Sequence, residues 1–146
     1  MNYTDVDQQL GNLVALLISS GQVTEDRLGD SLHPIELSPI KFWTLNHLVA
    51  AGEPLPLSEI AERLHCARSN ATQLIDRLEA EGLVHRIHDP HDRRMVRAEL
   101  TPAGRRRFEE GIALLEEPTH ELRDMFDPAE REQLANLLAR IRERWG

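Results

Sequence analysis

The sequence predicts a mainly α-helical fold with one small β-hairpin. Apolar residues recur at helical spacing along most of the 146 residues. Two short strand-like runs flank a turn crowded with His, Asp, Pro and Arg, between Leu83 and Thr101. Two short helical segments, joined at residues 65–67, come directly before this hairpin. At this length we expect a single domain, residues 1–146, with a buried core.

Two longer helices are expected before these elements. Apolar residues keep a helical spacing over residues 4–20, and the pattern extends to Leu32, although a glycine and a proline obscure where that helix ends. Ser38 can cap the next helix and Pro39 suits its first position. We therefore expect a second helix that runs to about Gly52.

Capping and turn residues predict the two short helices. Ser58 is expected to cap the first, which ends before the turn at residues 65–67. The second is expected over residues 68–80, with Gly82 placed to terminate it. Helix, turn, helix and hairpin in this order predict a winged helix-turn-helix lobe over residues 37–101, a shape that binds duplex DNA.

Two further helices are expected after the hairpin. Thr101 and Pro102 open a long one, which Pro118 should kink or break. The segment from Asp127 to Glu130 combines an acidic cap, a proline in the first turn and a glutamate three residues on, which marks the start of the last helix. That helix carries an apolar stripe formed by Leu134, Leu137, Leu138, Ile141 and Trp145.

Residues 68–80 have the divided surface of a recognition helix. The apolar residues fall on one face: Ala71, Leu74, Ile75 and Leu78. On the polar side, we expect base contacts in the major groove from Ser69, Asn70 and Gln73. Arg68 could reach a base or a phosphate, and Arg77 is expected at a phosphate. The helix alone fits solvated polar residues equally well, and the hairpin that follows favours DNA.

The hairpin turn has the composition of a DNA-binding wing. Arg93 and Arg94 lie at or just past its tip, where an arginine can enter the minor groove. Asp92 beside them is expected to support the wing, by holding an arginine side chain or by accepting from turn amides. Arg86, at the base of the first strand, is the expected partner of Asp92 across the hairpin.

Charge is distributed unevenly along the chain. The net charge is −8, yet residues 55–108 hold ten arginines against eight acidic residues, and the acidic excess lies in the flanking segments. A weakly basic face on an acidic body can bind DNA while limiting indiscriminate binding. The lone cysteine excludes an internal disulfide, and no apolar run is long enough to span a bilayer. The N-terminus lacks the pattern of a secretory signal, so the expected location is the cytoplasm.

The sequence bears on three kinds of input signal: a small ligand, oxidation and a metal ion. A small-molecule pocket is expected between the two lobes, with His33, Phe42, Trp43 and His47 as candidates for its wall, although the aromatic pair also suits the core. Cys66 precedes the recognition helix and could be oxidised there; its alternative role is to fill the turn. No metal or other cofactor is expected, because histidines at every third residue of a strand and turn are not made to converge on one ion.

Several of these motifs together resemble the MarR family of bacterial transcription regulators. The matching segments are Leu57–Leu64, Arg68-Ser69, Leu74–Glu79, Gly82–Val84, Arg86, Asp89-Pro90, Asp92–Arg94 and Leu100–Gly104. The resemblance implies an obligate homodimer built from residues 1–36 and 102–146, with two winged lobes that read a near-palindromic site. It also implies regulation, often repression, relieved by a small ligand or by oxidation. This chain departs from the family pattern at Ala67, where a polar helix cap is usual, and at Pro118.

The residues also support a dimer without the resemblance. The terminal helices carry apolar stripes with few other elements to cover them, and two-fold pairing would bury both stripes and place two recognition helices roughly 34 Å apart. The alternative is that the terminal helices pack within one chain. A winged-helix module that binds protein and not DNA is the competing function. An enzyme is not expected, since the sequence lacks a phosphate-binding glycine loop, a nucleophile elbow and a metalloprotease motif.

Overall fold

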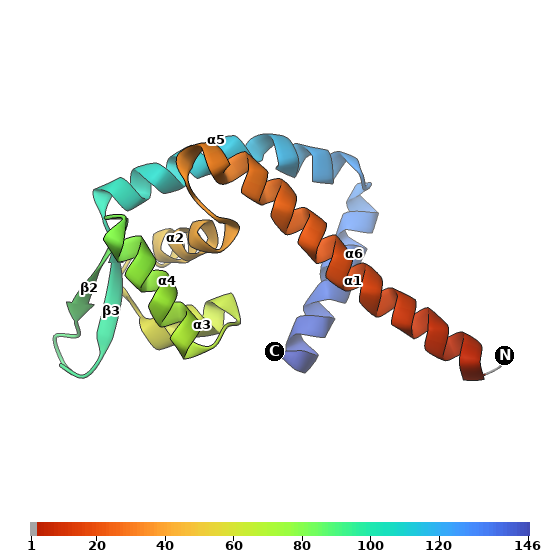
Figure 1. The fold of residues 1–146 in the computed structure, drawn as a ribbon, viewed down its shortest axis with the longest axis horizontal. Coiled ribbons are helices and arrows are strands. Elements are labelled where there is room, and N and C mark those ends of the chain that lie inside the picture. The colour runs from red at the N-terminus through yellow and green to blue at the C-terminus, as the bar shows by residue number, and fades with distance from the viewer. Residues whose placement is uncertain (1–2) are drawn as a thin grey trace.

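The computed structural model describes residues 3–146, with side chains from residue 8 onward, and confirms the expected fold class (Figure 1). The helices and strands, in chain order, are α1 (Tyr3–Leu32), the short 3-10 helix η1 (His33–Ile35), α2 (Pro39–Ala51), β1 (Leu55–Pro56), α3 (Leu57–Leu64), α4 (Arg68–Ala80), β2 (Val84–His88), β3 (Val96–Leu100), α5 (Pro102–Asp124) and α6 (Pro128–Trp145). No helix in the described part of the chain is long and apolar enough to cross a membrane.

The predicted helix boundaries hold where capping residues set them. Ser38 accepts from the backbone N–H of Lys41 at the start of α2, and Thr101 accepts from that of Gly104 at the start of α5. Asp127 and Glu130 form the full capping box of α6. Gly82 ends the α4 segment with a φ of 73°, a left-handed conformation that glycine adopts without strain.

Two local expectations were wrong. Ser58 does not cap α3, because the residues before it form the short strand β1, which pairs with β3 and makes Pro56 the cap position. Of the two effects expected of Pro118, a kink or a break, the break is wrong, because α5 is one continuous helix from Pro102 to Asp124. The proline ring is buried, and α1 packs along this part of α5, so tertiary packing offsets the hydrogen bond that Pro118 cannot donate.

The core of the molecule lies in the winged helix-turn-helix lobe. The three-stranded antiparallel sheet has the order β1-β3-β2, so β2 is an edge strand. Leu45, Ile60, Ile75, Leu78 and Val84 are almost fully buried where α2, α3, α4 and the sheet meet. The start of α5 closes on this lobe at Gly104, where a side chain would collide with the carbonyl oxygen of Leu83. A single apolar core therefore fixes α4 and the hairpin relative to each other.

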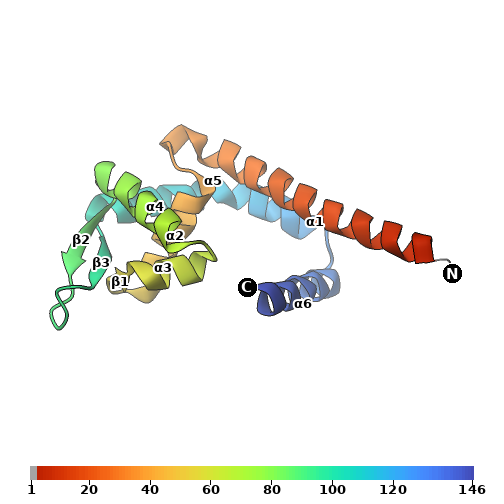
Figure 2. The same ribbon diagram turned by 60° about the horizontal axis from the view of Figure 1, so that its bottom comes forward.

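The terminal helices extend away from this core. Figure 1 shows α1 running from the winged lobe to the far end of the molecule. Figure 2 shows α6 with its C-terminal end directed towards α3, and Arg142 of α6 contacts His65 at the end of α3. Arg27 of α1 donates to both carboxylate oxygens of Glu121 on α5, at 3.2 and 3.0 Å. This paired contact joins α1 to α5, whereas the first half of α1 and most of α6 have few contacts within the chain.

Candidate nucleic-acid interface

The second helix of the helix-turn-helix, α4, buries the face that the sequence predicted. Ala71, Leu74, Ile75 and Leu78 are buried against the lobe. The polar residues that the sequence assigned to DNA are all exposed: Arg68, Ser69, Asn70, Gln73 and Arg77. Ala67 makes no side-chain capping bond, so the first N–H groups of α4 remain available to an outside acceptor.

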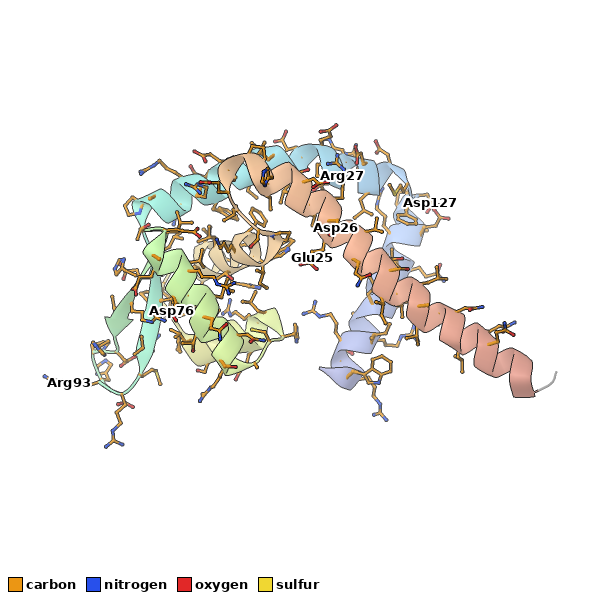
Figure 3. All side chains as sticks on the ribbon, viewed as in Figure 1. Glu25, Asp26, Arg27, Asp76, Arg93 and Asp127 are labelled. Atoms are coloured by element: carbon orange, nitrogen blue, oxygen red, sulfur yellow. The ribbon has the colours of Figure 1, made fainter. Side chains whose placement is uncertain are left out.

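The hairpin projects from the same edge of the molecule as the start of α4 (Figure 1). Arg93 and Arg94 lie in the exposed connection between β2 and β3, and Figure 3 shows Arg93 extending away from the protein. Asp92 accepts from the backbone N–H of Arg94 at 3.0 Å, the turn-amide role that the sequence allowed. One edge therefore presents both a polar helix start and an arginine-tipped loop.

The hairpin is braced mainly by a pair that the sequence analysis missed, Asp89 and Arg97. One oxygen of Asp89 accepts from the backbone N–H groups of His91 and Asp92, at 2.8 and 3.1 Å. Its other oxygen accepts from Nε of Arg97 at 2.6 Å, and Arg97 also donates to the carbonyl of Pro54. The bonds from the His91 backbone and from Arg97 lower the pKa of Asp89 from its ordinary value. The Asp89-Pro90 step before the turn was the available signal, since an aspartate there can accept from turn amides.

The expected pairing of Arg86 with Asp92 was wrong. Arg86 instead donates from Nη1 to Glu79 at 2.9 Å and from Nη2 to Asp76 at 2.5 Å, both on α4. Arg86 lies in β2 opposite Ala98 of β3, beside α4 and away from the turn that contains Asp92. It joins the wing to the recognition helix, whereas Asp89 and Arg97 brace the wing itself.

Ion pairs in the winged lobe involve some of its arginines and not others. The carboxylates of Asp76, Glu79 and Asp89 are engaged by arginines, and Glu99 lies 3.3 Å from His85. Among the described residues, no ion pair engages the exposed arginines of α4 and the hairpin tip, which are Arg68, Arg77, Arg93 and Arg94. Arginines thus pair with three carboxylates of α4 and the hairpin, while exposed arginines without an ion pair lie on α4 and at the tip of the wing.

A groove between α1, α2 and α5 occupies the expected position of a ligand pocket. It has a volume of about 590 Å³, and Trp43, Leu115 and Pro118 are part of its largely apolar wall. Trp43 is 44% exposed, whereas Phe42 is 2% exposed and belongs to the core. His33 and His47 are not among the residues that line this groove. Burial, with Arg63 and His65 nearby, lowers the pKa of His47, which places this side chain beside α3.

The other candidate signals have less structural support. Cys66 is half-buried in the turn between α3 and α4, so a redox role stays a prediction. The described residues contain no group of three or more His, Cys, Asp or Glu side chains that could hold a metal ion.

The chain is similar in sequence to known regulators. The model of the MarR family matches residues 35–95. An uncharacterised helix-turn-helix regulator of Bacillus subtilis, YsmB, is 32% identical over 131 residues, which cover 90% of this chain and 82% of that protein. The B. subtilis repressor MdtR is 33% identical over 107 residues, which cover 73% of this chain and 68% of MdtR.

Solved structures agree with the sequence comparison. A mutant of MarR from E. coli, crystallised with operator DNA, superimposes with a TM-score of 0.82 at 25% sequence identity, over 97% of this chain and 99% of that one. Both the sequence similarity and the fold extend well beyond the winged lobe into the terminal helices. The chain belongs to the MarR family of transcriptional regulators.

Proposed function

We propose that this protein is a homodimeric, sequence-specific regulator that binds double-stranded DNA through α4 and the wing. The observation that carries the proposal is the position of the unpaired arginines. Arg68 and Arg77 flank the polar residues of α4, and Arg93 and Arg94 tip the hairpin, while nearby carboxylates are occupied within the protein. A duplex supplies phosphates to such groups, base edges to Ser69, Asn70 and Gln73, and a minor groove to the wing.

A second copy of the chain is the proposed cover for the terminal helices. Exposed apolar side chains gather on α1 and on α6. They are Leu10, Leu13, Val14, Leu16 and Ile18 on α1, and Leu134, Leu137, Leu138 and Trp145 on α6. Exposed apolar side chains that cluster in this way are typical of a surface that binds another molecule. A two-fold pairing would bury them and would set two α4 helices against one face of a near-palindromic operator.

The groove beside Trp43 is the proposed input site. It lies between the helices that would form the dimer and α2 of the winged lobe, so a small apolar ligand there could change the spacing of the two lobes. We propose that the protein represses transcription, the action stated in the name of its relative MdtR. We also propose that it acts in the cytoplasm and that the ligand releases it from DNA.

Selection from a random-sequence duplex library tests DNA binding directly. We expect enriched duplexes with near-palindromic half-sites. Affinity should fall with salt at a log–log slope of about −0.9 for each phosphate neutralised, so that four phosphate contacts give a slope near −3.6. Retention of no duplex at low salt would overturn the proposal and favour the alternative of a winged-helix module that binds protein.

A duplex enriched in this selection also serves to test the redox alternative. Wild type and Cys66→Ser are compared on an enriched duplex before and after peroxide treatment. If Cys66 senses oxidation, peroxide weakens only the wild type. Equal affinities before and after treatment would leave ligand binding in the groove as the proposed input.

A further inference from the structure

The side chain of Arg86, in β2 of the wing, contacts the recognition helix α4 at several points. Its Nη1 donates to Glu79 at 2.9 Å and its Nη2 donates to Asp76 at 2.5 Å. Nη2 also lies 3.4 Å from the backbone carbonyl of Thr72. One planar guanidinium thereby spans three residues of α4 from its place in β2.

The backbone of Arg86 is held by the same helix. Because β2 is the edge strand, its outward N–H groups lack a strand partner. Glu79 Oε2 accepts from the backbone N–H of Arg86 at 2.7 Å, while Oε1 accepts from its side chain. Glu79 therefore covers the free edge of the sheet and fixes the strand to α4 at one point.

Charge gives this contact a second consequence. Asp76 follows Gln73 by three residues on α4, and its side chain is 59% exposed. Figure 3 places Asp76 on the exposed side of α4, away from the core. An unpaired carboxylate at this position would repel a phosphate backbone that approached Gln73 and Arg77. Arg86 supplies the compensating charge from within the protein, and its own side chain is 25% exposed.

We propose that Arg86 is a positioning residue for DNA recognition: it fixes α4 against β2 and neutralises Asp76 and Glu79, so that helix and wing meet their grooves as one unit. The proposal rests on the DNA binding proposed above. Both terminal nitrogens of Arg86 are engaged within the protein, so it acts through α4 and not by contact with DNA.

A double-mutant cycle separates positioning from direct contact. The probe is a duplex enriched from the random library, with a scrambled duplex as the non-specific reference. We expect Arg86→Ala to weaken binding of the enriched duplex about tenfold or more and of the scrambled duplex about twofold or less. In the Asp76→Ala/Glu79→Ala background, the same substitution should change affinity less than twofold, because the partners through which Arg86 acts are gone. An equal loss in both backgrounds would show direct contact with DNA and overturn the proposal.

Salt dependence gives an independent readout. In the Asp76→Ala/Glu79→Ala background, where no carboxylate is left without its partner, Arg86→Ala should leave the log–log salt slope of the enriched duplex unchanged, whereas loss of an arginine that contacts phosphate reduces it by about one. A reduced slope would contradict the proposal. Arg123→Ala, which removes an exposed arginine from a pair with Asp124 at the far end of α5, is the matched control and should alter affinity less than twofold.

A conservative variant keeps the test informative if Arg86→Ala fails to fold. Arg86→Lys preserves the charge but cannot span both carboxylates with one nitrogen. We expect Arg86→Lys to show the same lowered ratio of specific to non-specific affinity as Arg86→Ala. A wild-type ratio in Arg86→Lys would overturn the positioning role. Failure of the wild type to retain any duplex would instead overturn the proposed function.

Discussion

The winged lobe and the terminal helices differ in how far they bury their apolar residues. In the winged lobe, helices and sheet enclose one core, which fully buries Leu45, Ile60, Ile75 and Leu78. On the terminal helices, residues of the same kind stay open: Val23 is 68% exposed and Trp145 is 78% exposed. The comparison teaches that one copy of the chain buries the apolar residues of the first region and leaves many of those in the second region exposed.

The two regions also differ in how they use charge. Acidic residues outnumber basic ones in the chain as a whole, yet three of those in α4 and the hairpin, Asp76, Glu79 and Asp89, are bound by Arg86 and Arg97. The flanking helices carry the remaining acidic excess without such pairing on most of their surface. The acidic body should therefore repel DNA everywhere except at the edge where the unpaired arginines lie.

The largest expected effect comes from making the terminal helices unable to pair. Leu137→Glu with Leu138→Glu places two carboxylates on the apolar face of α6. We expect light scattering to give a mass near 16.7 kDa where the wild type gives about twice that, and affinity for an enriched duplex to fall on the order of a hundredfold as one half-site is lost.

A matched control separates pairing from added charge. Asn136→Glu with Ala139→Glu places the same two carboxylates on the opposite side of α6, at exposed positions. This variant should keep the mass of the wild type and most of its affinity. Equal dissociation of both variants would mean that α6 charge, and not its apolar face, controls assembly.

Within the winged lobe, Gln73→Ala sharpens the comparison by testing base recognition alone. Its side chain is exposed on α4 and has no role in the core, so the fold should be unaffected. We expect a loss of roughly 1–3 kcal/mol in discrimination at particular base pairs, measured by repeating the selection with the variant. An unchanged preference at every position would remove Gln73 from the interface.

Arg94→Ala should act more broadly and more weakly. The substitution removes an unpaired positive charge at the wing tip, so affinity for enriched and scrambled duplexes should fall together, by roughly tenfold or less. The log–log salt slope should become shallower by about one. A loss confined to the enriched duplex would indicate base recognition by Arg94.

The smallest effect concerns the bracing of the wing by Asp89. Its carboxylate has a lowered pKa in the folded protein, so its charged form stabilises the fold above the unfolded value of about 3.9, and this contribution is lost as pH falls towards the folded value. Asp89→Asn should therefore unfold at a lower temperature than the wild type at pH 7, and the difference should shrink below about pH 4. A difference that does not vary with pH would exclude the Asp89 carboxylate as its source.

Sequence reasoning succeeded where the determinants were local. The capping residues Ser38 and Thr101 and the apolar face of α4 each follow from spacing within one helix. It failed where partners are distant in the chain. Arg86 was assigned to the nearby turn, although the fold brings α4 closer, and strand β1 was missed because two residues form a strand only when β3 lies beside them.

The candidate site shows the same limit. The exposure of Gln73, Arg93 and Arg94 could be expected from a helical pattern and a turn. The place of His47 beside α3 could not, because it depends on which elements pack against α2. For Phe42 the sequence offered both a groove and the core, and the structure places it in the core. Aromatic and histidine residues at helical spacing do not by themselves distinguish a ligand groove from a core.

Hydroxyl-radical footprinting of the wild-type protein on an enriched duplex tests the central claim most directly. Two copies that present α4 and the wing to one face of the duplex should protect the sugar–phosphate backbone in two segments about 10 base pairs apart, with further backbone protection outside each segment where the wing enters the minor groove. A single protected segment, or protection that persists unchanged in Leu137→Glu/Leu138→Glu, would contradict the account.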